Sequence, residues 1–117
     1  MTKQFGPWNL YSDAAPPSSG ERFETLLQTG PLRVERIVSS CRPDTALYDQ
    51  EQDEWVMLLE GRAILEVQGN PMTLVRGDAL FLPAHTPHRV LETSDGALWL
   101  AVHHQPPKAG TAPDKAT

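Results

Sequence analysis

The 117-residue chain has a single cysteine, Cys41, so no disulfide can form within it. A lone thiol without a disulfide framework is typical of a reducing compartment. No apolar run approaches the roughly 18 residues that a membrane-spanning helix needs, and no basic-then-apolar leader opens the sequence. We therefore expect a soluble cytoplasmic protein in which Cys41 is a small, half-buried apolar residue.

Positive charge is also scarce. The chain has 10 Lys and Arg residues against 15 Asp and Glu residues, which gives a formal net charge of −5. Proteins that bind nucleic acid need a dense basic face to contact phosphates, and anionic membranes likewise attract basic segments. We therefore expect neither nucleic acid nor a membrane as a partner of this protein.

The length of the chain predicts one domain with two irregular ends. Residues 1–20 are rich in Pro, Ser and Gly and show no hydrophobic periodicity, which predicts an irregular N-terminal arm. Residues 21–104 contain the apolar segments and predict a barrel domain. Residues 105–117 lack any large apolar residue, so we expect them to form a flexible, solvated tail.

Within the middle of the chain, no long amphipathic helical pattern occurs, and six or seven short apolar segments alternate with turns. Residues 54–61, EWVMLLEG, are apolar on both faces, which predicts a strand buried on both sides. Residues 62–75 predict a hairpin with its turn around Gly69, Asn70 and Pro71. This spacing is typical of an antiparallel all-β sandwich or barrel, although residues 21–30 fit a helical turn equally well.

Polar side chains with ligand chemistry lie at the ends of two of these segments. Side chains two positions apart in a strand point the same way, so Tyr48, Gln50 and Glu54 share one face of their segment. His88 and Val90 share a face in the second segment. If the two segments lie side by side in one barrel, a carboxylate, an amide and an imidazole converge there.

The two segments resemble the paired motifs of the cupin superfamily, which are small jelly-roll β-barrels. The first cupin motif is H-x-H-x(3–4)-E-x6-G, and its end matches Glu54 followed after six residues by Gly61. The second motif is G-x5-P-x-G-x2-H-x3-N, and most of it matches Gly77, Pro83 and His88. The resemblance implies an all-β fold, an antiparallel jelly-roll β-barrel or double-stranded β-helix.

The resemblance also implies a partly retained metal site. In metal-binding cupins the two histidines and the glutamate of the first motif and the histidine of the second bind a divalent metal. Those positions are Tyr48, Gln50, Glu54 and His88 here, so both first-motif histidines are replaced. We expect any metal, Fe, Ni, Zn or Mn, to be bound by these four side chains.

The two replacements weaken this expectation on chemical grounds. An amide oxygen is a poor ligand for transition metals compared with an imidazole, and a phenol has a pKa near 10. A catalytic zinc usually needs three strong protein ligands. His85, His103 or His104 could add one, although 103 and 104 have opposite parity, so at most one of them faces inward. Exposure at a strand end is the simpler expectation for both.

Three functions remain open at this point. The first is a metal-dependent enzyme that acts on a small molecule, with Glu54 and His88 as its catalytic residues. The second is a metal-free binding module or sensor for a sugar or an organic acid. In the third, Glu54 and His88 form an acid/base pair without a metal, as in cupin-like epimerases. For each we expect a homodimer, because exposed sheet edges and faces favour self-association.

Overall fold

The computed structural model describes residues 6–106, so residues 107–117 of the predicted tail lie outside the described part of the chain. Within residues 6–106 the regular elements are all β-strands: β1 (Glu21–Thr29), β2 (Leu32–Ser39), β3 (Asp53–Glu60), β4 (Arg62–Val67), β5 (Asn70–Val75), β6 (Ala79–Leu82), β7 (His88–Thr93) and β8 (Ala97–His104). None of the described residues forms a helix that could cross a membrane.

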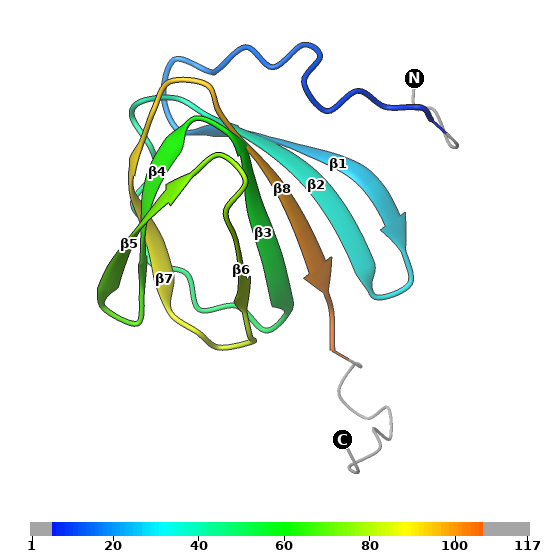
Figure 1. Cartoon of the computed structure of the whole chain (residues 1–117). Helices are drawn as coiled ribbons and strands as arrows, with labels where there is room; N and C mark the ends of the chain where they lie inside the picture. The colour runs from blue at the N-terminus through cyan, green and yellow to red at the C-terminus, as the bar shows by residue number, and fades with distance from the viewer. Residues whose placement is uncertain (1–5, 107–117) are drawn as a thin grey trace.

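The eight strands form two antiparallel sheets that enclose a common interior (Figure 1). The larger sheet has the order β1-β2-β8-β3-β6, and the smaller sheet has the order β5-β4-β7. The last strand, β8, lies between β2 and β3, so the end of the barrel domain is joined to its beginning. The prediction of an antiparallel all-β jelly roll is confirmed, and the ambiguous segment at residues 21–30 forms β1.

The core lies between the two sheets and follows from the alternation of side chains along each strand. On β3, Val56 and Leu58 point inward, and on β8 the large Trp99 lies between the small residues Ala97 and Ala101. All five are nearly inaccessible to water. Full burial of a side chain such as Leu58 stabilises the fold by roughly 2 kcal/mol.

Strands β4 and β5 form the predicted hairpin, but with a shorter turn than expected. Gln68 and Gly69 both have positive φ angles, 51° and 83°, and they alone connect the strands. Two consecutive positive φ angles define the two-residue turn whose twist matches that of the flanking strands. Asn70 and Pro71 therefore belong to β5 and pair with β4.

The outer face of the larger sheet departs from the sequence-based prediction. Trp55 on β3 is 51% exposed, and its neighbour on β6, Phe81, is 59% exposed. The prediction that β3 is buried on both faces was wrong, because the smaller sheet covers only its inner face. Cys41, expected to be half-buried, is also exposed. It follows β2 in a bend of the chain, beyond the cover of either sheet.

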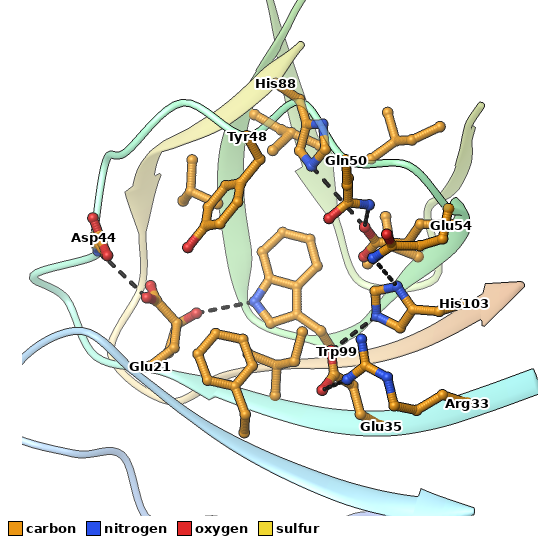
Figure 2. A pocket seen from close by; sticks show the side chains of 18 of the residues that line it. Glu21, Arg33, Glu35, Asp44, Tyr48, Gln50, Glu54, His88, Trp99 and His103 are labelled. Carbon is orange, nitrogen blue, oxygen red and sulfur yellow. Dashed lines mark hydrogen bonds and ion pairs between the residues drawn. The ribbon is translucent and has the colours of Figure 1, made fainter. Parts of the chain in front are cut away.

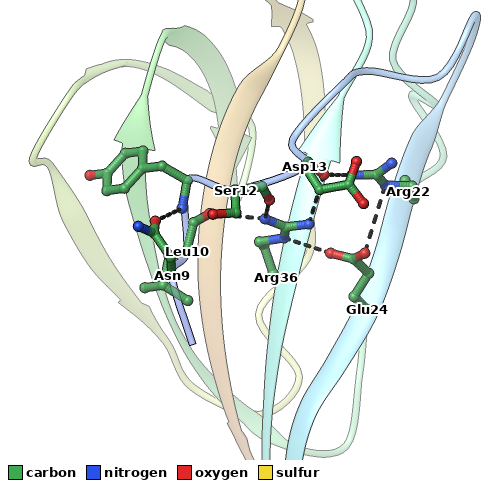
Figure 3. A network of polar contacts seen from close by, with 8 residues as sticks. Asn9, Leu10, Ser12, Asp13, Arg22, Glu24 and Arg36 are labelled. Carbon is green, nitrogen blue, oxygen red and sulfur yellow. Dashed lines mark hydrogen bonds and ion pairs between the residues drawn. The ribbon is translucent and has the colours of Figure 1, made fainter. Parts of the chain in front are cut away.

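The described part of the chain before β1 forms no strand, and one buried arginine binds it to the outer face of β2 (Figure 3). The guanidinium of Arg36 donates hydrogen bonds to the backbone carbonyl oxygens of Leu10 (3.0 Å), Ser12 (2.5 Å) and Asp13 (3.0 Å). Its Nε also donates to Glu24 on β1 at 2.5 Å. The segment before β1 is therefore fixed by side-chain chemistry and not by strand pairing.

Candidate functional site

A cavity of about 450 Å³ opens between the two sheets (Figure 2). Inward-facing side chains of both sheets line it, together with residues of the loop between β2 and β3. Apolar side chains form much of its wall: Ile37, Val56, Leu65, Leu82, Val90 and Trp99. The polar side chains lie in three groups at different parts of this wall.

The first polar group contains the residues that the sequence singled out. Glu54 on β3 and His88 on β7 belong to different sheets, and the Nε2 atom of His88 lies 4.0 Å from Oε1 of Glu54. Each residue is only 8% exposed. The amide of Gln50 donates a hydrogen bond to Oε1 of Glu54 at 2.8 Å, and Tyr48 lines the same cavity. The structure therefore brings all four side chains to one cavity.

The imidazole of His88 is held in one orientation. Its Nδ1 lies 2.8 Å from the backbone carbonyl oxygen of Thr86, which can only accept, so Nδ1 carries a proton. In the neutral ring, Nε2 then has the free lone pair and faces Glu54. The backbone of Tyr48 pairs with that of His88 through two hydrogen bonds of 2.8 and 2.9 Å, and their rings stack with centroids 5.9 Å apart.

The second polar group surrounds His103, which the sequence did not place in the interior. His103 is buried, and His104 is exposed, as their opposite parity requires. The Nε2 of His103 lies 2.9 Å from Oε1 of Glu35, whose other oxygen lies 2.9 Å from Nη1 of Arg33. The amide of Gln52 approaches Nδ1 of His103 at 3.3 Å. Both nitrogens of this imidazole are therefore engaged by protein groups.

The third polar group consists of Glu21 and Asp44. Oε1 of Glu21 accepts a hydrogen bond from the backbone N–H of Asp44 at 3.4 Å, and its Oε2 is buried without a hydrogen-bond partner among the described residues. Burial raises the pKa of Glu21, and the charge of Asp44 also raises it, while the backbone hydrogen bond lowers it. Burial also raises the pKa of Tyr48, with smaller contributions from Asp44 and Glu21.

Sequence reasoning missed the second and third groups. In β2 the residues that line the cavity are Arg33, Glu35, Ile37 and Ser39. In the sequence, charged Arg33 and Glu35 alternate with apolar Leu32 and Val34, and no residue of this strand was predicted to belong to the site. One signal was available in the sequence: Ser39, a small polar residue at the end of β2, shares a strand face with Glu35. In the structure its hydroxyl accepts a hydrogen bond from the indole of buried Trp99 at 3.0 Å.

The residues present do not fit a transition-metal centre. No group of three or more His, Cys, Asp or Glu side chains that could share a metal ion occurs in residues 6–106. Glu54 and His88 are two strong donors, but the amide of Gln50 donates to Glu54, and the raised pKa of Tyr48 makes a phenolate still less accessible. His85 is exposed and pairs with Asp49 at 3.0 Å, so it adds no ligand.

Comparison with known proteins gives one family and a consistent fold. The family model described as "Cupin domain" matches residues 44–103. A Ralstonia eutropha JMP134 protein, named as a candidate mannose-6-phosphate isomerase, is 38% identical over 86% of this chain and 99% of its own, with a TM-score of 0.78.

More distant solved structures share the fold alone. A Streptococcus pyogenes protein of unknown function is 17% identical over 91% of this chain and 92% of its own, with a TM-score of 0.77. A cupin superfamily protein from Desulfitobacterium hafniense DCB-2 is 18% identical over 90% of this chain and 95% of its own, also with a TM-score of 0.77. No curated protein sequence matches the chain.

Proposed function

The chain belongs to the cupin domain family, and from that membership we propose that it binds a small polar molecule in the cavity between its two sheets. The observation that carries this proposal is the pairing of His88 and Glu54 across the cavity, with Nε2 and Oε1 4.0 Å apart and both side chains buried. A cavity of about 450 Å³ with apolar walls and a few convergent polar groups is typical of small-molecule sites.

Each polar side chain of this group has a definite hydrogen-bonding capacity. The carboxylate of Glu54 accepts, the free Nε2 of His88 accepts while its ring is neutral, and the hydroxyl of Tyr48 can do both. A hydroxyl-bearing or amine-bearing ligand meets these requirements without a metal ion. The Ralstonia relative is named for an activity on a sugar phosphate, and a sugar-sized ligand is consistent with the volume of this cavity.

Acid/base catalysis is a second candidate, which the fixed tautomer of His88 favours. The hydrogen bond from Nδ1 to the carbonyl of Thr86 leaves Nε2 as the atom that can take a proton from a bound ligand. Glu54 faces that atom and would stabilise the imidazolium that forms. In this scheme the side chains of His88 and Glu54 are the catalytic residues, and no step requires a metal.

Thermal-shift screening of sugars, amino sugars and other small polar metabolites at millimolar concentration tests the binding proposal. We expect at least one compound to raise the melting temperature of the protein. His88→Gln and Glu54→Gln should each weaken its binding at least tenfold, because each removes a group that faces the ligand. His104→Gln is the matched control, since this histidine is exposed, and should leave binding unchanged. A screen without any stabilising compound contradicts the proposal.

We further propose a homodimer that forms through the outer face of the larger sheet. Trp55, Phe81 and Val102 form one row across β6, β3 and β8, and the first two are strongly exposed. Exposed apolar surface of this kind marks interaction sites. Light scattering should give the mass of two chains, and Trp55→Glu should give that of one. Leu91→Glu, on β7 of the other sheet, should remain dimeric; a wild-type monomer at all concentrations contradicts the proposal.

A further inference from the structure

The charges that line the cavity are strongly unbalanced. Four carboxylates line it, Glu21, Glu35, Asp44 and Glu54, against one guanidinium, that of Arg33. Arg33 is already engaged, because its Nη1 lies 2.9 Å from Glu35. A bound ligand therefore meets carboxylate oxygens at several points of the wall and no free cationic side chain among the described lining residues.

Among the described residues, three of these carboxylates, Glu21, Asp44 and Glu54, form no ion pair with a Lys or Arg side chain. Glu35 is compensated by Arg33 and hydrogen-bonded to His103. Within residues 6–106, the carboxylate of Glu54 receives a hydrogen bond only from the amide of Gln50. Nearby, His88 is more than nine-tenths buried, and its Nε2 has no hydrogen-bond partner in the described part of the chain. At the other end Oε2 of Glu21 is buried with no partner there either.

Aromatic side chains lie between these two ends. In Figure 2 the indole of Trp99 separates Glu21 from Glu54, and the ring of Tyr48 faces the same space. Phe23 of β1 also lines the cavity. The faces of aromatic rings attract cations, and recognition of ammonium groups commonly combines such rings with carboxylates. A phosphate or carboxylate ligand would instead have to approach carboxylates that no cationic side chain of the described lining compensates, in a partly desolvated space.

We infer that the ligand of this cavity is a small amine-bearing molecule whose body packs on Trp99 and whose ammonium group is bound by Glu54 or Glu21, and that anionic analogues are rejected. The inference rests on the proposed small-molecule function and adds the charge class of the ligand. It also gives a role to the buried oxygen of Glu21, which has no partner among the described residues. An ammonium N–H would supply that partner.

Titration calorimetry with compounds matched in skeleton but not in charge tests the inference. One set is mannosamine, mannose and mannose 6-phosphate; the other is tyramine and 4-hydroxyphenylacetate. We expect the amine of at least one set to bind in the millimolar range or tighter and at least tenfold tighter than its anionic analogue. Equal or tighter binding of the anion in either set overturns the inference, and so does failure of both amines at about 10 mM, the weak end of small-molecule affinity.

Variants of the lining carboxylates separate this inference from the proposed function. Glu21→Gln and Glu54→Gln should each weaken binding of the amine about tenfold and leave the anion unchanged or bound more tightly, since each removes one negative charge. Glu92→Gln, an exposed carboxylate outside the cavity, should change neither value. An anion that binds tightly, and loses affinity in His88→Gln, would overturn the cation preference while supporting a small-molecule site.

Discussion

Gly61→Ala is expected to lower the free energy of unfolding by about 2 to 5 kcal/mol. Gly61 joins β3 to β4 with a φ of +91°, a conformation that costs a residue with a side chain about 1 to 2 kcal/mol. A Cβ atom at this position would also lie 2.6 Å from Oγ of Ser94 and 3.0 Å from Cα of Ala97. Overpacking of this kind typically adds about 1 to 3 kcal/mol.

The contact atoms have little freedom to move away. Oγ of Ser94 accepts a hydrogen bond from the backbone N–H of Arg62 at 2.9 Å, and Cα of Ala97 belongs to the start of β8. Relief of the overlap with the added methyl group therefore requires loss of that hydrogen bond or a shift of the strand. The same glycine matches the end of the first cupin motif, so a local packing requirement accounts for a motif position that does not line the cavity.

Gly69→Ala is the matched control for this experiment. Gly69 has a similar φ of +83° in the turn between β4 and β5, but nothing lies within 4 Å of the position that its Cβ would occupy. We expect only the backbone cost there, about 1 to 2 kcal/mol. Chemical denaturation of both variants measures the two values. Equal destabilisation would show that the contacts with Ser94 and Ala97 do not matter.

Much of the fold was predictable because it depends on local patterns. The alternation of apolar residues and the turn residues indicated the strands from β2 to β8, and the spacing of Glu54, Gly61, Gly77 and His88 indicated the family. Strand parity predicted that Glu54 and His88 converge if their segments lie side by side. In the structure β3 and β7 belong to different sheets, and the two side chains meet across the cavity between them.

The remaining features depend on contacts between segments far apart in the chain, which periodicity does not describe. His103 is internal because β8 lies between β2 and β3, where it neighbours Arg33 and Glu54 in register. Glu21 lines the cavity because β1 pairs with β2 at the edge of the larger sheet. The exposure of Trp55 reflects how little of the outer face is covered by the other described residues. None of these placements follows from the residues next to each position.

Arg36 illustrates the same limit and gives the second large effect. In the sequence it is one charged residue within β2, between Glu35 and Ile37, and charged side chains are ordinarily solvent-facing. In the structure it is 6% exposed, and its guanidinium makes four hydrogen bonds, three of them to backbone carbonyl oxygens before β1. No other type of side chain presents planar donors in this arrangement.

Arg36→Met should therefore lower the free energy of unfolding by about 2 to 4 kcal/mol, because it keeps the aliphatic stem but removes four hydrogen bonds that a buried, charged guanidinium donates. Arg36→Lys, which retains the charge but not the fork of donors, should lie between this variant and the wild type. Hydrogen exchange should also accelerate at the amides of Tyr11 and Ser12, which are hydrogen-bonded to Asn9 in the fixed segment. Exchange at the core strands should change only as far as global stability does.

Arg62→Met is the control for loss of a strand arginine as such, since Arg62 is exposed and its side chain makes no hydrogen bond or ion pair among the described residues. We expect it to change stability by less than about 0.5 kcal/mol. If Arg36→Met behaved in the same way, or if exchange at Tyr11 and Ser12 stayed at its wild-type rate, the guanidinium would not be what fixes the segment before β1. The hydrogen bonds from Arg22 to the carbonyl of Asp13 and from Tyr11 to the carbonyl of Leu59 would then have to account for its position.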